Sequence, residues 1–171
     1  MESYTRKSKY ECPYVPEGRV VLYVPDTNIF MIEAKEYALK YCTKIRQPCA
    51  AVIIQNENVV GVGSIGNNPK HSVGCERELF NMPTGVGYEI CEGCDPKFHS
   101  EISAIRDALS KGNDIKNADL YLWGHWWCCK DCWQTMIKAG IKDVYLLENS
   151  EILFNKKDPN NIIGHQFDKK E

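Results

Sequence analysis

The sequence predicts an α/β domain in which helices pack on a mixed β-sheet. Two observations predict this fold class. A β-hairpin is indicated at about residues 51–64, and two helix–strand pairs follow it between residues 99 and 148. A further helix is expected before the hairpin. The order hairpin, helix, strand, helix, strand is typical of helices that cover a mixed sheet.

The first helix is expected to begin near residue 26 and to run through about Lys44. A polar side chain can cap its first turn by accepting from free backbone N–H groups, and the sequence offers Asp26, Thr27 and Asn28. The helical spacing predicts an inner face made of Ala34, Ala38 and Tyr41. Residues 1–24 before it are rich in Tyr, Pro, Lys and Arg and are expected to be irregular or partly extended.

The hairpin is predicted from two β-rich runs, residues 51–54 and 59–64, on either side of the turn sequence "QNEN". Residues 65–98 then combine Gly, Pro, Asn, His and Cys without a helical or strand period. A segment of this length in a compact domain is usually functional, tied by a metal or disordered.

The two helix–strand pairs complete the domain. "HSEISAIRDALSKG" predicts a helix that ends at Gly112 and buries Ile102, Ile105 and Leu109, and "ADLYLW" predicts the strand after it. "CCKDCWQTMIKAG" predicts a helix that ends at Gly140 and turns Met136 and Ile137 inward, and "IKDVYLLE" predicts the last strand.

Three parts are therefore expected along the chain: an N-terminal arm at 1–24, one domain at 25–150 and a C-terminal tail at 151–171. The tail is polar except for an apolar cluster of Ile152, Leu153 and Phe154, so it is expected to pack on the domain or to extend from it. A chain of 171 residues suits one domain with its own core.

The composition indicates which kinds of partner and which cellular compartment are to be expected. The net charge of -2 provides no overall basic field that would attract nucleic acid. No apolar run approaches the length of a membrane span, and the polar start "MESYTRKSKY" does not resemble a signal peptide, so a cytoplasmic protein is expected. In a reducing compartment, nine cysteines are expected to be metal ligands or buried thiols rather than disulfides.

Two short motifs, "HSE" and "CKDC", each open a predicted helix. Cys129 and Cys132 lie one turn apart, so both thiolates can bind one tetrahedral zinc, and the helix N-terminus stabilises their charge. His99 can supply a third ligand from the neighbouring helix. Three protein ligands leave one position for water, which is the arrangement of a catalytic zinc.

Glu101 lies too close to His99 in sequence to bind the same ion comfortably, and it is placed to contact the ligand in the fourth position. Zinc lowers the pKa of bound water from about 15.7 towards 7, and a carboxylate can then take its proton. The pair of motifs H-x-E and P-C-x-x-C is the signature of zinc-dependent nucleobase deaminases.

Through these motifs the sequence resembles the cytidine and deoxycytidylate deaminase superfamily, and most closely its deoxycytidylate branch, from about residue 34 to residue 148. "CAAVIIQNENVVGVGS", "HSEISAI", "LYLWGHWWCCKDC" and "AGIKDVYLLE" carry the resemblance. It implies a three-layer α/β/α fold with a central mixed sheet of about five strands. It further implies that His99, Cys129 and Cys132 hold zinc and that Glu101 is the general acid/base.

The sequence departs from the family pattern at two places. The proline before the first zinc cysteine is Cys128 here, which makes a fourth thiolate ligand conceivable, although adjacent residues at a helix start point apart. The family's "GxNG" reads "GSIG", so Ile65 stands where the nucleoside-binding asparagine is expected, and Asn67 or Asn68 is expected to replace it after a small shift. Trp126 and Trp127 are expected to line the base pocket, since indoles stack on pyrimidines, and Arg77 is a candidate for a 5′-phosphate.

A second, structural zinc is expected in the long segment before His99. "CEGC" provides another CxxC pair, and the expected ligands are Cys75, Cys91, Cys94 and either His71 or Cys42. Some members of the resembled family carry a second zinc in this region.

Three functions remain open from the sequence. The first is deamination of a cytosine nucleotide, dCMP to dUMP and ammonia, by a protein expected to be a homo-oligomer. The second is deamination of cytosine or adenine in single-stranded nucleic acid, which the near-neutral charge disfavours. The third is a non-catalytic, zinc-stabilised binding module, which would require Cys128 to seal the metal.

Overall fold

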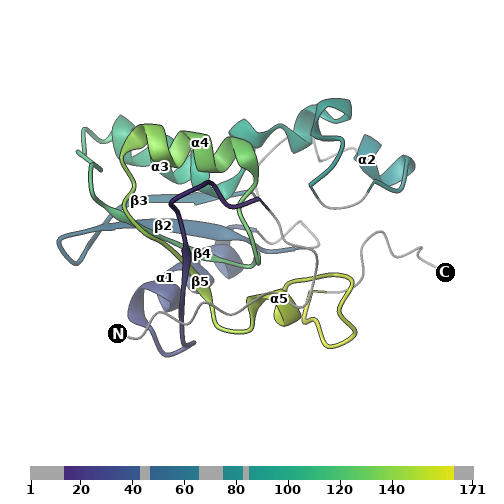
Figure 1. Cartoon of the computed structure of the whole chain (residues 1–171), viewed down its shortest axis with the longest axis horizontal. Helices are drawn as coiled ribbons and strands as arrows, with labels where there is room; N and C mark the ends of the chain where they lie inside the picture. The colour runs from purple at the N-terminus through teal and green to yellow at the C-terminus, as the bar shows by residue number, and fades with distance from the viewer. Residues whose placement is uncertain (1–13, 43–46, 66–74, 83–84, 164–171) are drawn as a thin grey trace.

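The computed structural model describes residues 14–42, 47–65, 75–82 and 85–163 (Figure 1). In these residues five strands form one mixed sheet in the order β1-β5-β4-β2-β3. The strands are β1 (Val21–Val24), β2 (Ala50–Gln55), β3 (Asn58–Ser64), β4 (Asp119–Trp123) and β5 (Val144–Leu147). The three strands β1, β5 and β4 are parallel, whereas β2 is antiparallel to both of its neighbours.

Helices cover both faces of the sheet, so the predicted three-layer α/β/α fold is confirmed. The helices α3 (Ser100–Ser110) and α4 (Lys130–Ala139) lie side by side on one face, and α1 (Ile29–Tyr41) and α5 (Ser150–Leu153) lie on the other (Figure 1). The segment before α3 contains α2 (Glu76–Leu79) and three 3-10 turns: η2 (Tyr88–Ile90), η3 (Glu92–Cys94) and η4 (Pro96–Phe98).

The two buried cores match the two faces. The first contains Ala104, Ile105 and Ala108 of α3 with Trp133 and Met136 of α4, packed on the sheet. The second contains Met31, Ala34 and Ala38 of α1 with strand residues such as Val52 and Tyr121. Alanines at the contact bring α1 and α3 close to the strands, so the helix that carries the HSE motif is held tightly on the sheet.

The predicted boundaries mostly agree with the structure. Asn28 caps α1, accepting from the backbone N–H groups of Phe30 and Met31 at 3.0 Å, and the hairpin turns at Asn56 and Glu57 with positive φ angles. α1 ends at Tyr41, before the predicted Lys44, which lies outside the described residues.

Three side chains predicted to face inward are exposed instead. Tyr41, Leu109 and Ile137 are 39%, 55% and 39% exposed. In α3 the alanines at 104 and 108 form the inner face, which turns Leu109 outward, and in α4 the buried position is Met136. Close packing on the sheet thus selects alanine in α3, whereas α4 buries the large side chains of Trp133 and Met136.

The two chain ends add to the sheet and to its second face. Residues 21–24, which the sequence analysis assigned to the arm, form the edge strand β1 along β5. Arg19, just before β1, attaches this strand to the segment before β5 by donating to the carbonyls of Ile141 and Lys142 at 3.0 and 2.9 Å. In the tail, Phe154 is buried with its ring edge against Trp123, so the tail packs on the domain as far as residue 163.

Within the described ranges, no helix has both the length and the apolar composition needed to cross a bilayer.

Candidate active site

The two motifs meet where α3 and α4 begin, beyond the carboxyl end of β4. His99 occupies the N-cap position of α3, and Glu101 lies in the first turn of that helix. Cys129 occupies the N-cap position of α4, with Cys132 in its first turn. The two helices are neighbours on one face of the sheet, so their N-termini bring together residues that are thirty positions apart in sequence (Figure 1).

The side chains of His99, Cys129 and Cys132 fit a tetrahedral metal ion. The Nδ1 atom of His99 lies 3.5 Å from the sulfur of Cys129 and 3.4 Å from that of Cys132. All three donor atoms lie within 4.8 Å of one another. Zinc with tetrahedral bonds of about 2.3 Å to sulfur and 2.0 Å to nitrogen separates such atoms by about 3.5 Å. The trio therefore has the chemistry and the spacing of a zinc site.

Cys129 and Cys132 affect each other's pKa even without a metal ion. Hydrogen bonds from Cys132 and from His99 lower the pKa of Cys129 to about 5, although burial opposes this change. The hydrogen bond to Cys129 and burial raise the pKa of Cys132. One thiolate next to one thiol is thus favoured, and a divalent cation would favour both thiolates because it supplies the missing positive charge.

Glu101 is buried beside this trio, with 5% of its surface exposed. Burial raises the pKa of its carboxyl, the charge of His99 partly offsets this, and the charge of Cys129 adds to it. An upward shift brings the pKa of a carboxyl closer to the working pH, which is the direction that a general acid/base requires.

Cys128 lies next to the trio but does not belong to it. Its side chain is buried, and it hydrogen-bonds the side chain of Glu101 rather than joining the group formed by His99, Cys129 and Cys132. Burial raises the pKa of the Cys128 thiol well above its usual value, and the charge of Glu101 raises it further. Adjacent residues at the start of α4 point apart, as the sequence analysis anticipated.

The ring of His99 has two further partners that sequence reasoning missed. The ring hydrogen-bonds the backbone carbonyl of Cys94. Because Nδ1 faces the two sulfurs, the donor to this carbonyl is Nε2. The ring of Tyr88 contacts the His99 ring edge-on, with centroids 5.0 Å apart. A single tyrosine in an irregular segment gives no sequence signal for such a contact.

These contacts also affect protonation of His99. Burial by itself lowers the pKa of His99, but the hydrogen bond to Cys129 and the charge of Glu101 raise it overall. The carbonyl of Cys94 adds to this increase. An imidazole held at both nitrogens has a fixed orientation and tautomer, which favours metal binding through Nδ1.

The tryptophan-rich loop between β4 and α4 turns tightly at Gly124. Its φ angle is +94°, and a Cβ atom there would lie 2.1 Å from the carbonyl oxygen of Pro48, so only glycine fits. The Nδ1 atom of His125 accepts hydrogen bonds from the backbone N–H groups of Trp126 and Trp127 at 3.0 and 3.3 Å. His125 thus organises the loop from within, and burial lowers its pKa to about 3.

The two tryptophans of this loop pack in opposite directions. Trp126 packs against the second core, whereas Trp127 packs against the first core, on the side that carries the zinc trio. The ring of Trp127 also covers Gly85. Its indole Nε1 is buried and has no hydrogen-bond partner within the part of the chain that the structure describes.

The remaining predicted residues divide into three groups. Cys75, Cys91 and Cys94 come together, with their sulfur atoms within 4.8 Å of one another. Cys42 does not join them, because its thiol donates to the carbonyl of Cys49 at 3.2 Å within the core, so its proposed role as a metal ligand is wrong. His71 and Asn67 lie outside the described residues.

Arg77 is placed differently from the phosphate contact that the sequence suggested. Its Nε donates to the carbonyl of Val86 at 2.9 Å, and its Nη1 lies 3.7 Å from the sulfur of Cys94. Its guanidinium group lies over the ring of Tyr88, 4.8 Å from the centroid. Arg77 therefore links parts of the segment before α3, and its contact with a substrate phosphate stays a prediction.

Comparison with known proteins identifies one family. Residues 25–148 match the family model described as the cytidine and deoxycytidylate deaminase zinc-binding region. This match contains the HSE and CKDC motifs. No curated protein matches the chain.

Several solved structures are similar at low identity. A guanine deaminase from Bacillus subtilis is 19% identical over 73% of this chain and 67% of its own, with a TM-score of 0.47. A dCMP deaminase from the cyanophage S-TIM5, in complex with dCMP and dUMP, is 18% identical over 71% of this chain and 82% of its own, with a TM-score of 0.46. A diaminohydroxyphosphoribosylaminopyrimidine deaminase/reductase from Thermotoga maritima is 19% identical, with a TM-score of 0.41. The alignment with it covers 68% of this chain but only 29% of that longer protein.

Proposed function

Because this chain belongs to the cytidine and deoxycytidylate deaminase family, which its residues 25–148 match, we propose that it is a zinc-dependent hydrolase that converts dCMP to dUMP and ammonia. The observation that carries this proposal is the buried carboxylate of Glu101 beside the trio of His99, Cys129 and Cys132. A structural zinc site has no need of an acid/base group at that position, whereas hydrolytic deamination does.

The three residues of the trio would hold the zinc through one imidazole nitrogen and two thiolates. When bound there, the ion supplies a water molecule whose pKa is lowered from about 15.7 towards 7. The Cys94 carbonyl keeps His99 in the orientation that presents Nδ1 to the ion.

Glu101 moves the protons of the reaction. Its carboxylate accepts a proton from the attacking water and passes it to N3 of cytosine as the water oxygen bonds to C4. The same carboxyl then takes the second proton of this oxygen and gives it to the departing amine as the C4–N bond breaks. Cytosine and water become uracil and ammonia, and Glu101 returns to its starting state.

The pyrimidine ring is expected to lie beside Trp127, whose indole packs on the zinc side of the loop and whose buried Nε1 has no partner among the described residues. Trp126 and Asn67 remain proposed contacts with the base and the sugar. An aromatic wall excludes water from the reacting carbon and stacks on the base.

The net charge of the chain favours a mononucleotide over a nucleic-acid strand as the substrate. The chain carries a net charge of -2, whereas strand binding depends largely on phosphate neutralisation by lysine and arginine. A panel with dCMP, dCTP, deoxycytidine and single-stranded DNA, scored by ammonia release and uracil formation, tests the proposal. Turnover of dCMP supports it. Turnover of DNA with none of dCMP overturns the substrate, and turnover of no member of the panel contradicts a cytosine deaminase.

We propose further that the enzyme acts in the cytoplasm as a homo-oligomer. No disulfide joins the cysteines of the described residues, and reduced cysteines are typical of a reducing compartment. The adjacent helices α3 and α4 expose Leu109 and Ile137, and a second copy of the chain could cover these side chains. Sedimentation of the purified chain as a monomer at micromolar concentration would contradict the assembly.

A further inference from the structure

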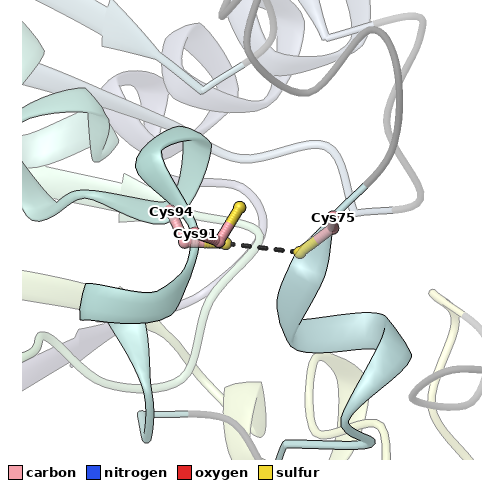
Figure 2. Close-up of side chains that lie close together, drawn as sticks. All are labelled: Cys75, Cys91 and Cys94. Atoms are coloured by element: carbon pink, nitrogen blue, oxygen red, sulfur yellow. Dashed lines mark hydrogen bonds between the residues drawn. The ribbon is translucent and has the colours of Figure 1, made fainter.

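Three cysteines outside the proposed active site converge in the segment before α3. Cys75 caps α2, Cys91 lies at the boundary between η2 and η3, and Cys94 ends η3. Figure 2 shows their side chains meeting in the space between α2 and these turns. The sulfur atoms of Cys75 and Cys94 are 3.5 Å apart, and the three sulfur atoms lie within 4.8 Å of one another.

Hydrophobic packing does not account for this cluster. Cys91 and Cys94 are 1% and 8% exposed, yet neither belongs to either of the two hydrophobic cores. Tyr88 is the one residue of η2 to η4 that packs against the first core. The thiols are therefore buried mainly by a segment whose regular structure consists of short turns, and such a segment gains little stability from its own backbone hydrogen bonds.

The cluster is joined to the proposed active site by direct contacts. The backbone carbonyl of Cys94 accepts the hydrogen bond from the ring of His99. Tyr88 contacts the same ring edge-on, and Arg77 lies over Tyr88 while its Nη1 points to the sulfur of Cys94. Two of the groups that orient His99 thus belong to the turns that carry the cysteines.

We propose that Cys75, Cys91 and Cys94 bind a second zinc ion, and that this ion positions His99 by holding the Cys94 carbonyl and Tyr88 against its ring. The second half of this proposal rests on the proposed function, because it treats His99 as a ligand of the catalytic zinc. His99 is the ligand, and Cys94 and Tyr88 are positioning residues.

The donor set selects zinc. Three thiolates are soft ligands that favour zinc over the hard cations magnesium and calcium, which prefer oxygen. Two thiolates on one tetrahedral zinc lie about 3.8 Å apart, close to the separation of Cys75 and Cys94. A zinc ion held by these three thiolates would tie α2 to the turns before α3 and so fix the path of the chain that leads to His99.

Metal content of the full-length protein tests the first half of the proposal. The wild type is expected to hold two zinc ions per chain, measured by elemental analysis after removal of free metal. Cys75→Ser is expected to hold one, and this half-buried position can be changed without a cavity in a core. Cys42→Ser is the matched control, because Cys42 is buried but lies outside the cluster, and it should hold two.

The paired variant Cys132→Ser separates this proposal from the proposed function. It should lose the catalytic ion and keep the other, so its count should also be one. If Cys132→Ser leaves the count unchanged while Cys75→Ser lowers it, the second site stands and the catalytic site is wrong. If the wild type binds one zinc and Cys75→Ser still binds one, the second site is wrong. Iron with a visible absorption band in place of zinc would likewise overturn the choice of metal.

Chelator resistance tests the second half. In Cys75→Ser the remaining zinc should be removed at a chelator concentration about 10 to 100 times lower than the catalytic zinc of wild type, the usual effect of losing an outer partner of a metal ligand. Tyr88→Phe keeps the ring and should leave the resistance unchanged, whereas Tyr88→Ala should lower it. Unchanged resistance in both Cys75→Ser and Tyr88→Ala would show that the two sites are independent and would overturn the coupling.

Discussion

Replacing Gly63 by alanine should displace the start of helix α3, and with it the active-site residues His99 and Glu101. Gly63 lies in β3 directly beneath the first turns of α3. A Cβ atom there would lie 2.3 Å from the backbone nitrogen of Ala104 and 2.5 Å from the carbonyl oxygen of Ser100. Its φ angle is not in the left-handed region, so the expected effect is due to steric overlap and not to backbone strain.

The size of the effect follows from these distances. Ordinary contact begins at 3.4 Å, so the start of α3 must move away from β3 by 1.1 Å, the difference between 3.4 and 2.3 Å. The neighbours are backbone atoms, which cannot rotate aside. Overpacking of this kind costs about 1–3 kcal/mol of stability. A displacement of about 1 Å at reacting groups can cost about 100-fold in rate, and His99 and Glu101 would move with the helix.

Gly61→Ala is the matched control. Its Cβ atom would lie 2.6 Å from the carbonyl oxygen of Ala104 and from the Cβ atom of Ala108, one turn further from the active site. Both variants should lower the midpoint of thermal unfolding by several degrees, but only Gly63→Ala should lower kcat/KM by about 100-fold and reduce zinc retention. Equal kcat/KM in Gly63→Ala and wild type, with intact zinc, would refute the idea that β3 sets the position of the HSE motif.

Three further predictions concern the loop, the core and Cys128. His125 takes up its proton at about pH 6.5 when unfolded but near pH 3 when folded, so stability should fall as pH drops below about 6.5, by at most about 2 kcal/mol at pH 5. His125→Asn keeps an acceptor for the loop, so urea unfolding at pH 7 and pH 5 should show a smaller difference than in wild type; an unchanged difference would contradict this origin. Met136→Ala should cost about 2–5 kcal/mol, and Ile137→Ala less than about 1 kcal/mol, in urea unfolding; similar losses would show that the assignment of the buried face of α4 is wrong. Cys128→Ser should keep the zinc content of wild type, because Cys128 contacts Glu101 rather than the trio; loss of zinc would favour a sealed, non-catalytic site.

The sequence was sufficient to predict the elements whose residues act locally. Asn28 as a cap, the hairpin turn and the two helix starts with their candidate metal ligands all depend on spacings of a few residues. The fold class and the trio with Glu101 followed from these local patterns together with the family resemblance.

Contacts between distant segments could not be predicted in the same way. The hydrogen bond from His99 to the carbonyl of Cys94 depends on a backbone group, which every residue has, and the edge contact of Tyr88 depends on the path of an irregular segment. Arg77 illustrates the same limit, since a lone arginine in sequence suggests an anion, whereas its neighbours here are a carbonyl, a sulfur and an aromatic ring.

The order of the sheet also required tertiary information. Residues 21–24 form a strand because β5 offers an edge to them, and no alternation in "VLYV" marks this pairing. Leu109 was misplaced because the tight packing of α3 on β3 favours alanine at the buried positions, and Ile137 was misplaced because Trp133 and Met136 form the buried face of α4.

The most direct test of the proposed chemistry is Glu101→Gln, measured for zinc content and for ammonia release with a substrate that the wild type turns over. Glutamine keeps the size of the side chain but cannot carry the protons. We expect the variant to bind as much zinc as wild type and to lose at least about 100-fold in kcat. Wild-type ammonia release from a zinc-loaded Glu101→Gln protein would contradict the assignment of this carboxylate as the proton carrier.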